Sequence, residues 1–299
     1  MISMTIYTQI DSNIRRTWLL FSLFFIIVIG LGWALSYYFN DQAILFIAVF
    51  ISIFMSFISY WYSDKIVLAI SRAKPLRHEE NPELYHIVEN LCITAGLPMP
   101  KIYIIDDPSP NAFATGRNPK NAVVAVTRGL LQILNRTELE GVIAHELSHI
   151  GNRDILLQTV VVVLVGAITM IADIFVRGRL FRGRRSEGEG GGQAQAILLL
   201  VGLVFIILSP IFAKLIQLAI SRKREFLADA SGALLTRYPE GLASALVRIS
   251  QNPIPLRVAN TATAHLYIAN PLKNKGLSKL FMTHPPIEER IKRLREMSF

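Results

Sequence analysis

The stretch from Thr137 to Asp154 reads TELEGVIAHELSHIGNRD and contains two histidines four residues apart. On an α-helix, His145 and His149 project from the same face, so both imidazoles can bind one zinc ion. Glu146 then lies beside the metal, where a water molecule would sit. The stretch therefore predicts a catalytic zinc site.

The sequence around these histidines also predicts the helix that carries them. Thr137 as N-cap with Glu140 three residues later forms a capping-box pattern. An apolar stripe follows, made of Leu139, Val142, Ile143, Leu147 and Ile150. The alternative is a buried structural histidine pair, but an apolar helix normally carries few histidines and rarely two in register. The pattern favours zinc.

The composition indicates a membrane protein. Apolar residues make up 52% of the 299 residues, and the mean hydropathy of +0.41 is high for a soluble chain. The net charge is +9, but the basic excess lies beside apolar runs, which fits membrane-flanking anchors and argues against a nucleic-acid partner. The single cysteine, Cys92, excludes an intramolecular disulfide and is expected in the core.

Four apolar segments predict two membrane hairpins. Each segment is long enough to span a bilayer. They are Trp18–Phe39 and Ala43–Tyr62, within an N-terminal hairpin at residues 1–62, and Ile155–Val176 and Ala194–Ile220, within a second hairpin at residues 154–220. Arg15 and Arg16 before the first segment, and basic residues after the second, place both ends of the first hairpin in the cytoplasm.

The second hairpin contains an Arg/Gly-rich loop at residues 177–193, with five arginines. The positive-inside rule would hold this loop in the cytosol. A zinc site shared by residues before and after the hairpin instead requires both segments to leave and return on one side. Whether residues 154–220 cross the bilayer fully therefore stays open.

Two cytosolic parts, residues 63–153 and 221–299, are expected to form the catalytic domain. Asn81-Pro82 is typical of a helix start, and Gly96 of its end. Short strands are expected at residues 101–105 and 122–127. Further helices are expected at residues 225–235, 239–250 and 287–297.

A catalytic zinc ion usually has three protein ligands, so a third must come from elsewhere. Glu225 in the segment EFLAD is the best candidate. Asp229 lies four residues later on the same helical face, so one carboxylate can reach the metal while the other binds the free nitrogen of a ligand histidine. Taken alone, EFLAD is more simply explained as a solvated helix face with two acidic residues. Together with the histidine motif, the ligand role is favoured instead.

These motifs together resemble the HtpX-type membrane metalloproteases, relatives of the prenyl-protein (CAAX) endoproteases. The resemblance covers essentially the whole chain. It rests on HELSH at 145–149, SRKREFLAD at 221–229, NAFATG at 111–116 and THPP at 283–286, set between two apolar hairpins.

The resemblance implies a role for each matching residue. One zinc ion per chain would be bound by His145, His149 and Glu225, with Glu146 as the base. Asp229 resembles the acid that orients a ligand, and His284 resembles a histidine that helps at the transition state. A surface histidine fixed by a Pro-Pro turn remains the alternative for His284. An exposed edge bordering the substrate cleft would be formed by Asn111, Ala112, Phe113 and Ala114.

We therefore expect a mainly α integral membrane protein with two transmembrane hairpins and a zincin-like (gluzincin) α+β catalytic domain with a small β-sheet. The resemblance implies a zinc endopeptidase of the bacterial inner membrane, with its active site facing the cytoplasm. Its substrates would be polypeptides, chiefly misfolded or damaged membrane proteins cut at their cytosolic parts. The alternatives are a dedicated protease for lipidated C-terminal motifs and a non-catalytic membrane scaffold with structural zinc. Glu146 argues against the scaffold, because a structural site has no use for a free acid beside its ligands.

Overall fold

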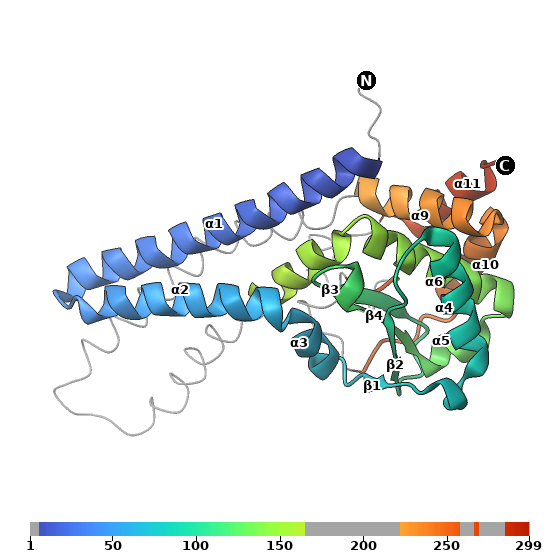
Figure 1. Ribbon diagram of the computed structural model, residues 1–299, viewed down its shortest axis with the longest axis horizontal. Helices are drawn as coiled ribbons and strands as arrows, with labels where there is room; N and C mark the ends of the chain where they lie inside the picture. Colours follow the sequence, from blue (N-terminus) through green and yellow to red (C-terminus); the bar gives the residue numbers. More distant parts are fainter. Residues whose placement is uncertain (1–5, 165–221, 258–265, 269–284, 299) are drawn as a thin grey trace.

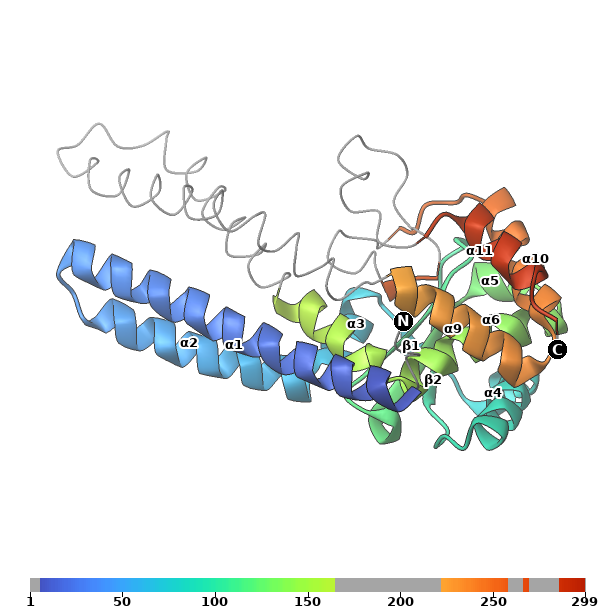
Figure 2. The same ribbon diagram turned by 90° about the horizontal axis from the view of Figure 1, so that it is seen from above.

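A computed structural model describes residues 6–164, 222–257, 266–268 and 285–298. Two long antiparallel helices, α1 and α2, extend side by side away from a body that contains a small sheet and the remaining labelled helices (Figures 1 and 2). The start of α1 lies at this body, beside α9. The hairpin is thus joined to the body at its base.

The described elements form a mostly helical chain with a mixed sheet. The helices are α1 (Ile6–Phe39), α2 (Ala43–Trp61), α3 (Ser63–Ile70), α4 (Pro82–Ala95), α5 (Arg128–Ile133), α6 (Arg136–Gly151), α9 (Arg222–Thr236), α10 (Pro239–Gln251) and α11 (Ile287–Arg295), with short 3₁₀ turns at His78–Glu80 and Pro119–Asn121. The strands are β1 (Lys74–Pro75), β2 (Lys101–Ile105), β3 (Ala112–Gly116) and β4 (Ala122–Thr127). A further apolar helix covers Asp154–Leu164.

The first predicted hairpin is confirmed as two helices long and apolar enough to cross a membrane. Most of their apolar surface is not buried within the protein, and the exposed side chains include Trp18, Trp33, Phe46, Phe50 and Phe57. Exposed apolar surface on this scale is costly in water. The hairpin therefore fits membrane anchoring. The second predicted hairpin lies outside the described residues, except for Asp154–Leu164.

The sheet has the strand order β1-β2-β4-β3. Strands β2 and β4 are parallel, whereas β1 pairs antiparallel with β2, and β3 pairs antiparallel with β4. Both sequence-predicted strands are confirmed with their bounds. Strands β1 and β3 were not predicted, because β1 has only two residues and β3 begins in a Pro- and Asn-rich stretch that is typical of a loop.

The core lies on both faces of the sheet. Ile104 and Val124 face a large cluster formed with α4, α6 and α10. Phe113 and Ala125 face a second cluster, formed with Val67 of α3 and with Leu256, Leu266 and Tyr267. Because the sheet is covered on both faces, all six residues of β4 are buried. The sheet is thereby a fixed platform beneath α6.

Several predicted details of the helices are confirmed. Asn81 caps α4 by accepting from the Leu84 N–H at 3.0 Å, Pro82 is its first residue, and Gly96 ends it in the left-handed conformation. Cys92 is buried on this helix, as expected. Helices α9, α10 and α11 form where helical segments were expected.

The predicted cap of the motif helix is wrong. Helix α6 begins at Arg136, and its capping box is formed by Asn135 and Glu138. Glu138 is buried and accepts hydrogen bonds from Ser244 and Arg248 of α10, both at 2.7 Å. These contacts with a distant helix select Glu138 over Glu140.

Candidate metal centre

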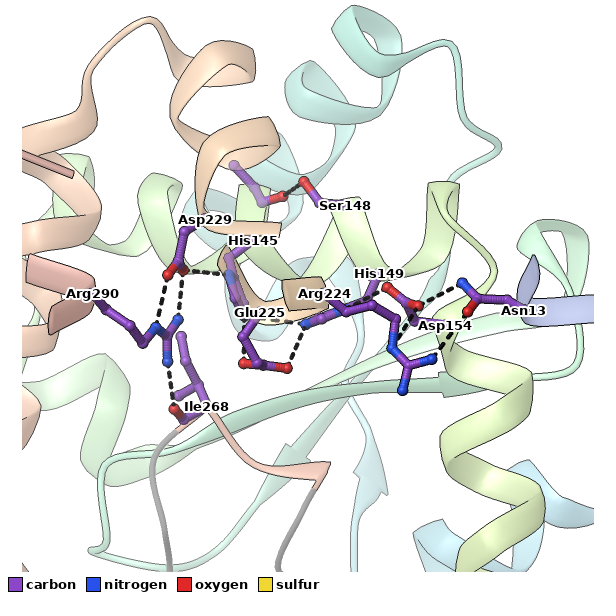
Figure 3. Close-up of polar contacts among 11 residues, drawn as sticks. Asn13, His145, Ser148, His149, Asp154, Arg224, Glu225, Asp229, Ile268 and Arg290 are labelled. Atoms are coloured by element: carbon purple, nitrogen blue, oxygen red, sulfur yellow. Dashed lines mark hydrogen bonds and ion pairs between the residues drawn. The ribbon is translucent and has the colours of Figure 1, made fainter. Parts of the chain in front are cut away.

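Three side chains converge on one point between α6 and α9 (Figure 3). His145 and His149 project from α6, and Glu225 projects from the first turn of α9. Glu225 Oε2 lies 3.9 Å from His145 Nε2, and Glu225 Oε1 lies 3.6 Å from His149 Nε2. One donor atom from each residue falls within 4.8 Å of the others, and all three residues are buried. Glu225, the candidate third ligand, thus lies beside the two histidines although it comes 76 positions after His149 in the sequence.

The orientation of the two imidazoles fits a bound cation. Their Nε2 atoms face each other at 3.2 Å, and their Nδ1 atoms each lie 3.0 Å from a carboxylate oxygen. A neutral imidazole that donates from Nδ1 presents a lone pair at Nε2. Two lone pairs and a carboxylate around one buried point form a donor set that a divalent cation such as zinc satisfies.

The electrostatics of the site also favour a cation. Burial lowers the pKa of His149, but the hydrogen bond with Asp154 and the charges of Glu225, Asp154 and Glu146 outweigh burial and raise it to about 9. The same negative surroundings that hold a proton on His149 attract a metal ion that would replace that proton.

Asp229 lies behind His145, as the sequence predicted for one member of the EFLAD pair. Its Oδ1 lies 3.0 Å from His145 Nδ1, although the two groups are not aligned for an ideal hydrogen bond. Arg290 of α11 binds Asp229 through two hydrogen bonds, from Nε at 2.9 Å and from Nη2 at 2.7 Å, and also donates to the backbone oxygen of Ile268. Burial raises the pKa of Asp229, but Arg290 and His145 lower it to about 2. Asp229 is therefore ionised throughout the neutral range.

Asp154 lies behind His149 in the corresponding position. Its Oδ2 lies 3.0 Å from His149 Nδ1 (Figure 3). Arg153 has a φ of 56°, in the left-handed region, which interrupts the helical path after α6 directly before Asp154. Each imidazole thus has a carboxylate oxygen 3.0 Å from its Nδ1 atom, which favours the orientation with Nε2 toward Glu225.

Glu146 is buried beside the three converging groups. The backbone N–H of Ala114 in β3 lies near enough to influence its carboxylate. Burial raises the pKa of Glu146, an effect that the neighbouring histidines and the Ala114 N–H oppose. A raised carboxyl pKa suits a group that accepts a proton and passes it on.

The predicted substrate edge is at the sheet edge, but it is not exposed. Strand β3 is the last strand in the order, yet Asn111 and the strand residues Ala112, Phe113 and Ala114 are all buried. The backbone oxygen of Ala112 accepts a hydrogen bond from the Ile268 N–H at 3.1 Å. The sequence could not show that residues 266–268 cover this edge.

His284 lies outside the described residues, and two other groups were missed by sequence reasoning. The sequence predicts Arg290 only as part of the helix at residues 287–297, but its place between Ile287 and Leu294 in the apolar stripe indicates burial. For Asp154, the sequence predicts no role beyond the end of the histidine motif.

An HExxH helix, joined by a carboxylate from a second helix and supported by a sheet strand, defines a metallopeptidase site. Proteins with similar sequences belong to the same class. The chain is 50% identical over 294 residues to a protease HtpX homolog of Dictyoglomus turgidum, a match that covers 98% of this chain and 95% of that protein. It is 47% identical over 300 residues to a protease HtpX homolog of Caldanaerobacter subterraneus subsp. tengcongensis, with 98% of both chains covered.

Residues 78–298 match the peptidase family M48, to which the chain belongs. The fold agrees with a solved structure, the crystal structure of S. mikatae Ste24p, with a TM-score of 0.51 and 19% sequence identity. That match covers 89% of this chain and 62% of the Ste24p chain. The protein is thus a metallopeptidase, and the expected family is confirmed.

Proposed function

We propose that this protein is a zinc-dependent endopeptidase anchored in the bacterial inner membrane, and that it cleaves misfolded or damaged membrane proteins at their cytosolic parts. The convergence of His145, His149 and Glu225, with Glu146 beside them, is the observation that carries the proposal. Family membership supports the peptidase chemistry, and the exposed apolar hairpin supports the location.

Each residue of the site has its own role in the proposed mechanism. Zinc, when bound, lowers the pKa of a coordinated water and polarises the scissile carbonyl. Glu146 accepts a proton from the attacking water and passes it to the departing amine. Asp229 and Asp154 lie beside the Nδ1 atoms of the two imidazoles, so that both Nε2 atoms, toward Glu225, would be available to hold the zinc ion. We further propose that His284 donates a hydrogen bond to the developing oxyanion.

The mechanism is tested by replacing Glu146 with Gln in the full-length protein purified in detergent. We expect the variant to retain zinc, while kcat for a casein-type substrate falls by about 10² to 10⁴. Glu140→Gln is the matched control, because Glu140 lies on the same helix but pairs with Arg136 near the surface. A Glu146→Gln protein that still cleaves would refute the mechanism. His284→Ala should likewise lower kcat with zinc retained, and unchanged turnover would remove His284 from the mechanism.

Substrate choice can be tested in proteoliposomes. We expect cleavage within the unfolded cytosolic segment of a membrane protein, and the same segment without its membrane anchor should be cut more slowly. We propose that residues 111–114 border the substrate cleft, that a peptide adds along β3 where residues 266–268 do not cover it, and that cleavage sites are therefore diverse. A single tight consensus would contradict this. Preferential cleavage of a prenylated peptide would instead favour a dedicated protease for lipidated C-terminal motifs.

The orientation in the membrane is tested with cysteines introduced at exposed aspartates, since the native Cys92 is buried. Asp41 lies in the link between α1 and α2, and Asp106 follows β2 in the body. A membrane-impermeant maleimide should label Asp41→Cys in spheroplasts, and should label Asp106→Cys only after the inner membrane is permeabilised. The reverse pattern would place the active site outside the cytoplasm.

A further inference from the structure

An asparagine of the membrane hairpin reaches the metal centre. Asn13 lies near the start of α1, ahead of the apolar run that begins at Trp18, and its side chain is buried (Figure 3). Its Nδ2 donates to Asp154 Oδ1 at 2.7 Å and to the backbone oxygen of Asn152 at 3.0 Å. Its Oδ1 accepts a hydrogen bond from Arg224 Nη1 at 3.0 Å. The Asn13 amide thus connects α1 to Asp154, beside His149, and to Arg224, beside Glu225.

The hydrogen-bonding partners fix the orientation of this amide. A guanidinium offers donors only, so Arg224 must face the amide oxygen of Asn13. The amide nitrogen then faces Asp154, whose Oδ1 accepts from it at 2.7 Å. Few other side chains offer one acceptor and one donor at this short reach, so an apolar residue or a carboxylate at position 13 would leave a buried partner unsatisfied.

Asp154 connects the Asn13 amide to His149, a candidate metal ligand. Its Oδ1 is held by Asn13 and lies 3.4 Å from Arg224 Nε, while its Oδ2 lies 3.0 Å from His149 Nδ1. Arg224 also directly precedes Glu225, the ligand candidate on α9. The Asn13 amide therefore contacts both the carboxylate beside His149 and the residue directly before Glu225.

We propose that Asn13 is a positioning residue of the metal centre, and that the N-terminal hairpin is therefore part of the active site as well as a membrane anchor. Asn13 acts through Asp154 and His149 and touches neither metal nor substrate. The inference rests on the proposed zinc site at His145, His149 and Glu225. A residue that only docked α1 against the body would affect stability but not the affinity for zinc.

The test compares zinc affinities of full-length proteins in detergent. Zinc dissociation constants are measured by competition with a chromogenic chelator, and the visible spectrum of the cobalt-substituted protein reports the geometry of the ligands. For Asn13→Leu, we expect the zinc dissociation constant to rise about 10- to 100-fold, and the cobalt spectrum to change. Asn13→Ser should show the same loss, because its short hydroxyl cannot reach both Arg224 and Asp154; it also decides the question if the Leu variant does not fold.

The matched control is Thr17→Val, one turn further along α1. Thr17 is equally buried, and its hydroxyl donates to the Asn13 backbone oxygen within the helix. We expect wild-type zinc affinity and spectrum for this control. If the Asn13 variants bind zinc as tightly as the wild type with an unchanged cobalt spectrum, the positioning role is overturned, even where their thermal stability falls. Failure of the wild type itself to bind zinc would instead refute the proposed function.

Discussion

Gly232 of α9 packs directly against the backbone of His145 in α6. A Cβ atom at Gly232 would lie 2.9 Å from the backbone nitrogen of His145 and 3.1 Å from its Cα atom. Glu225 and Asp229 lie on the same helix, within two turns of Gly232. The absence of a side chain at this position therefore sets how closely the third ligand candidate approaches the histidines.

Replacing Gly232 with Ala should weaken the metal centre. The atoms in the way belong to a helix backbone, which cannot rotate aside, so α6 and α9 must separate. We expect a loss of about 1–3 kcal/mol in stability and a weaker zinc affinity. Thermal unfolding and chelator competition measure the two effects.

The control for this prediction is Gly151→Ala at the end of α6. A Cβ atom at Gly151 would meet nothing closer than a Leu97 methyl carbon at 3.8 Å, which is an ordinary contact. Stability and zinc affinity should remain at wild-type values. Equal effects of the two substitutions would show that close approach at Gly232 is not what matters.

Removing Arg290 should be strongly destabilising. Its guanidinium is fully buried and is paired with Asp229, so Arg290→Met leaves an uncompensated carboxylate behind His145. We expect a cost of about 3–5 kcal/mol, measured by thermal or denaturant unfolding in detergent. The double variant Arg290→Met, Asp229→Leu should recover part of this loss, because it removes both charges. A double variant less stable than Arg290→Met would contradict the assigned pairing.

Cys92 should be unreactive in the folded protein. Burial raises the pKa of its thiol to about 11, and the thiolate is the reactive form. At pH 8 only about one thiol in a thousand is ionised, and this fraction rises about tenfold per pH unit below pH 11. Alkylation followed by mass spectrometry should show slow modification that accelerates on unfolding. Rapid alkylation of the native protein at pH 8 would show that this part of α4 is not packed as described.

The parts of the site that could be predicted from sequence are those set by helical spacing. His145 and His149 share a face because they are four residues apart, and Glu225 and Asp229 do so for the same reason. Predicting that these two helices meet also required the expectation that one zinc ion has three protein ligands. The structure brings both pairs together.

The parts that could not be predicted depend on contacts between distant segments. Arg290 is buried because Asp229 neutralises it from 61 positions away, and the cap at Asn135 is selected through Glu138 by α10. Asn13 lies 141 positions from Asp154. A buried polar residue looks like a surface residue in sequence when its partner is this remote.

Two imidazoles from α6 and one carboxylate from α9 are proposed to bind a single zinc ion. Zinc K-edge X-ray absorption on the purified full-length protein tests this binding most directly. We predict one zinc ion per chain, with two imidazole nitrogens at about 2.0–2.1 Å and oxygen ligands at about 2.0–2.2 Å, and a lost oxygen ligand in Glu225→Ala. A protein that cleaves substrate without metal, or a spectrum that lacks imidazole scattering, would contradict the account.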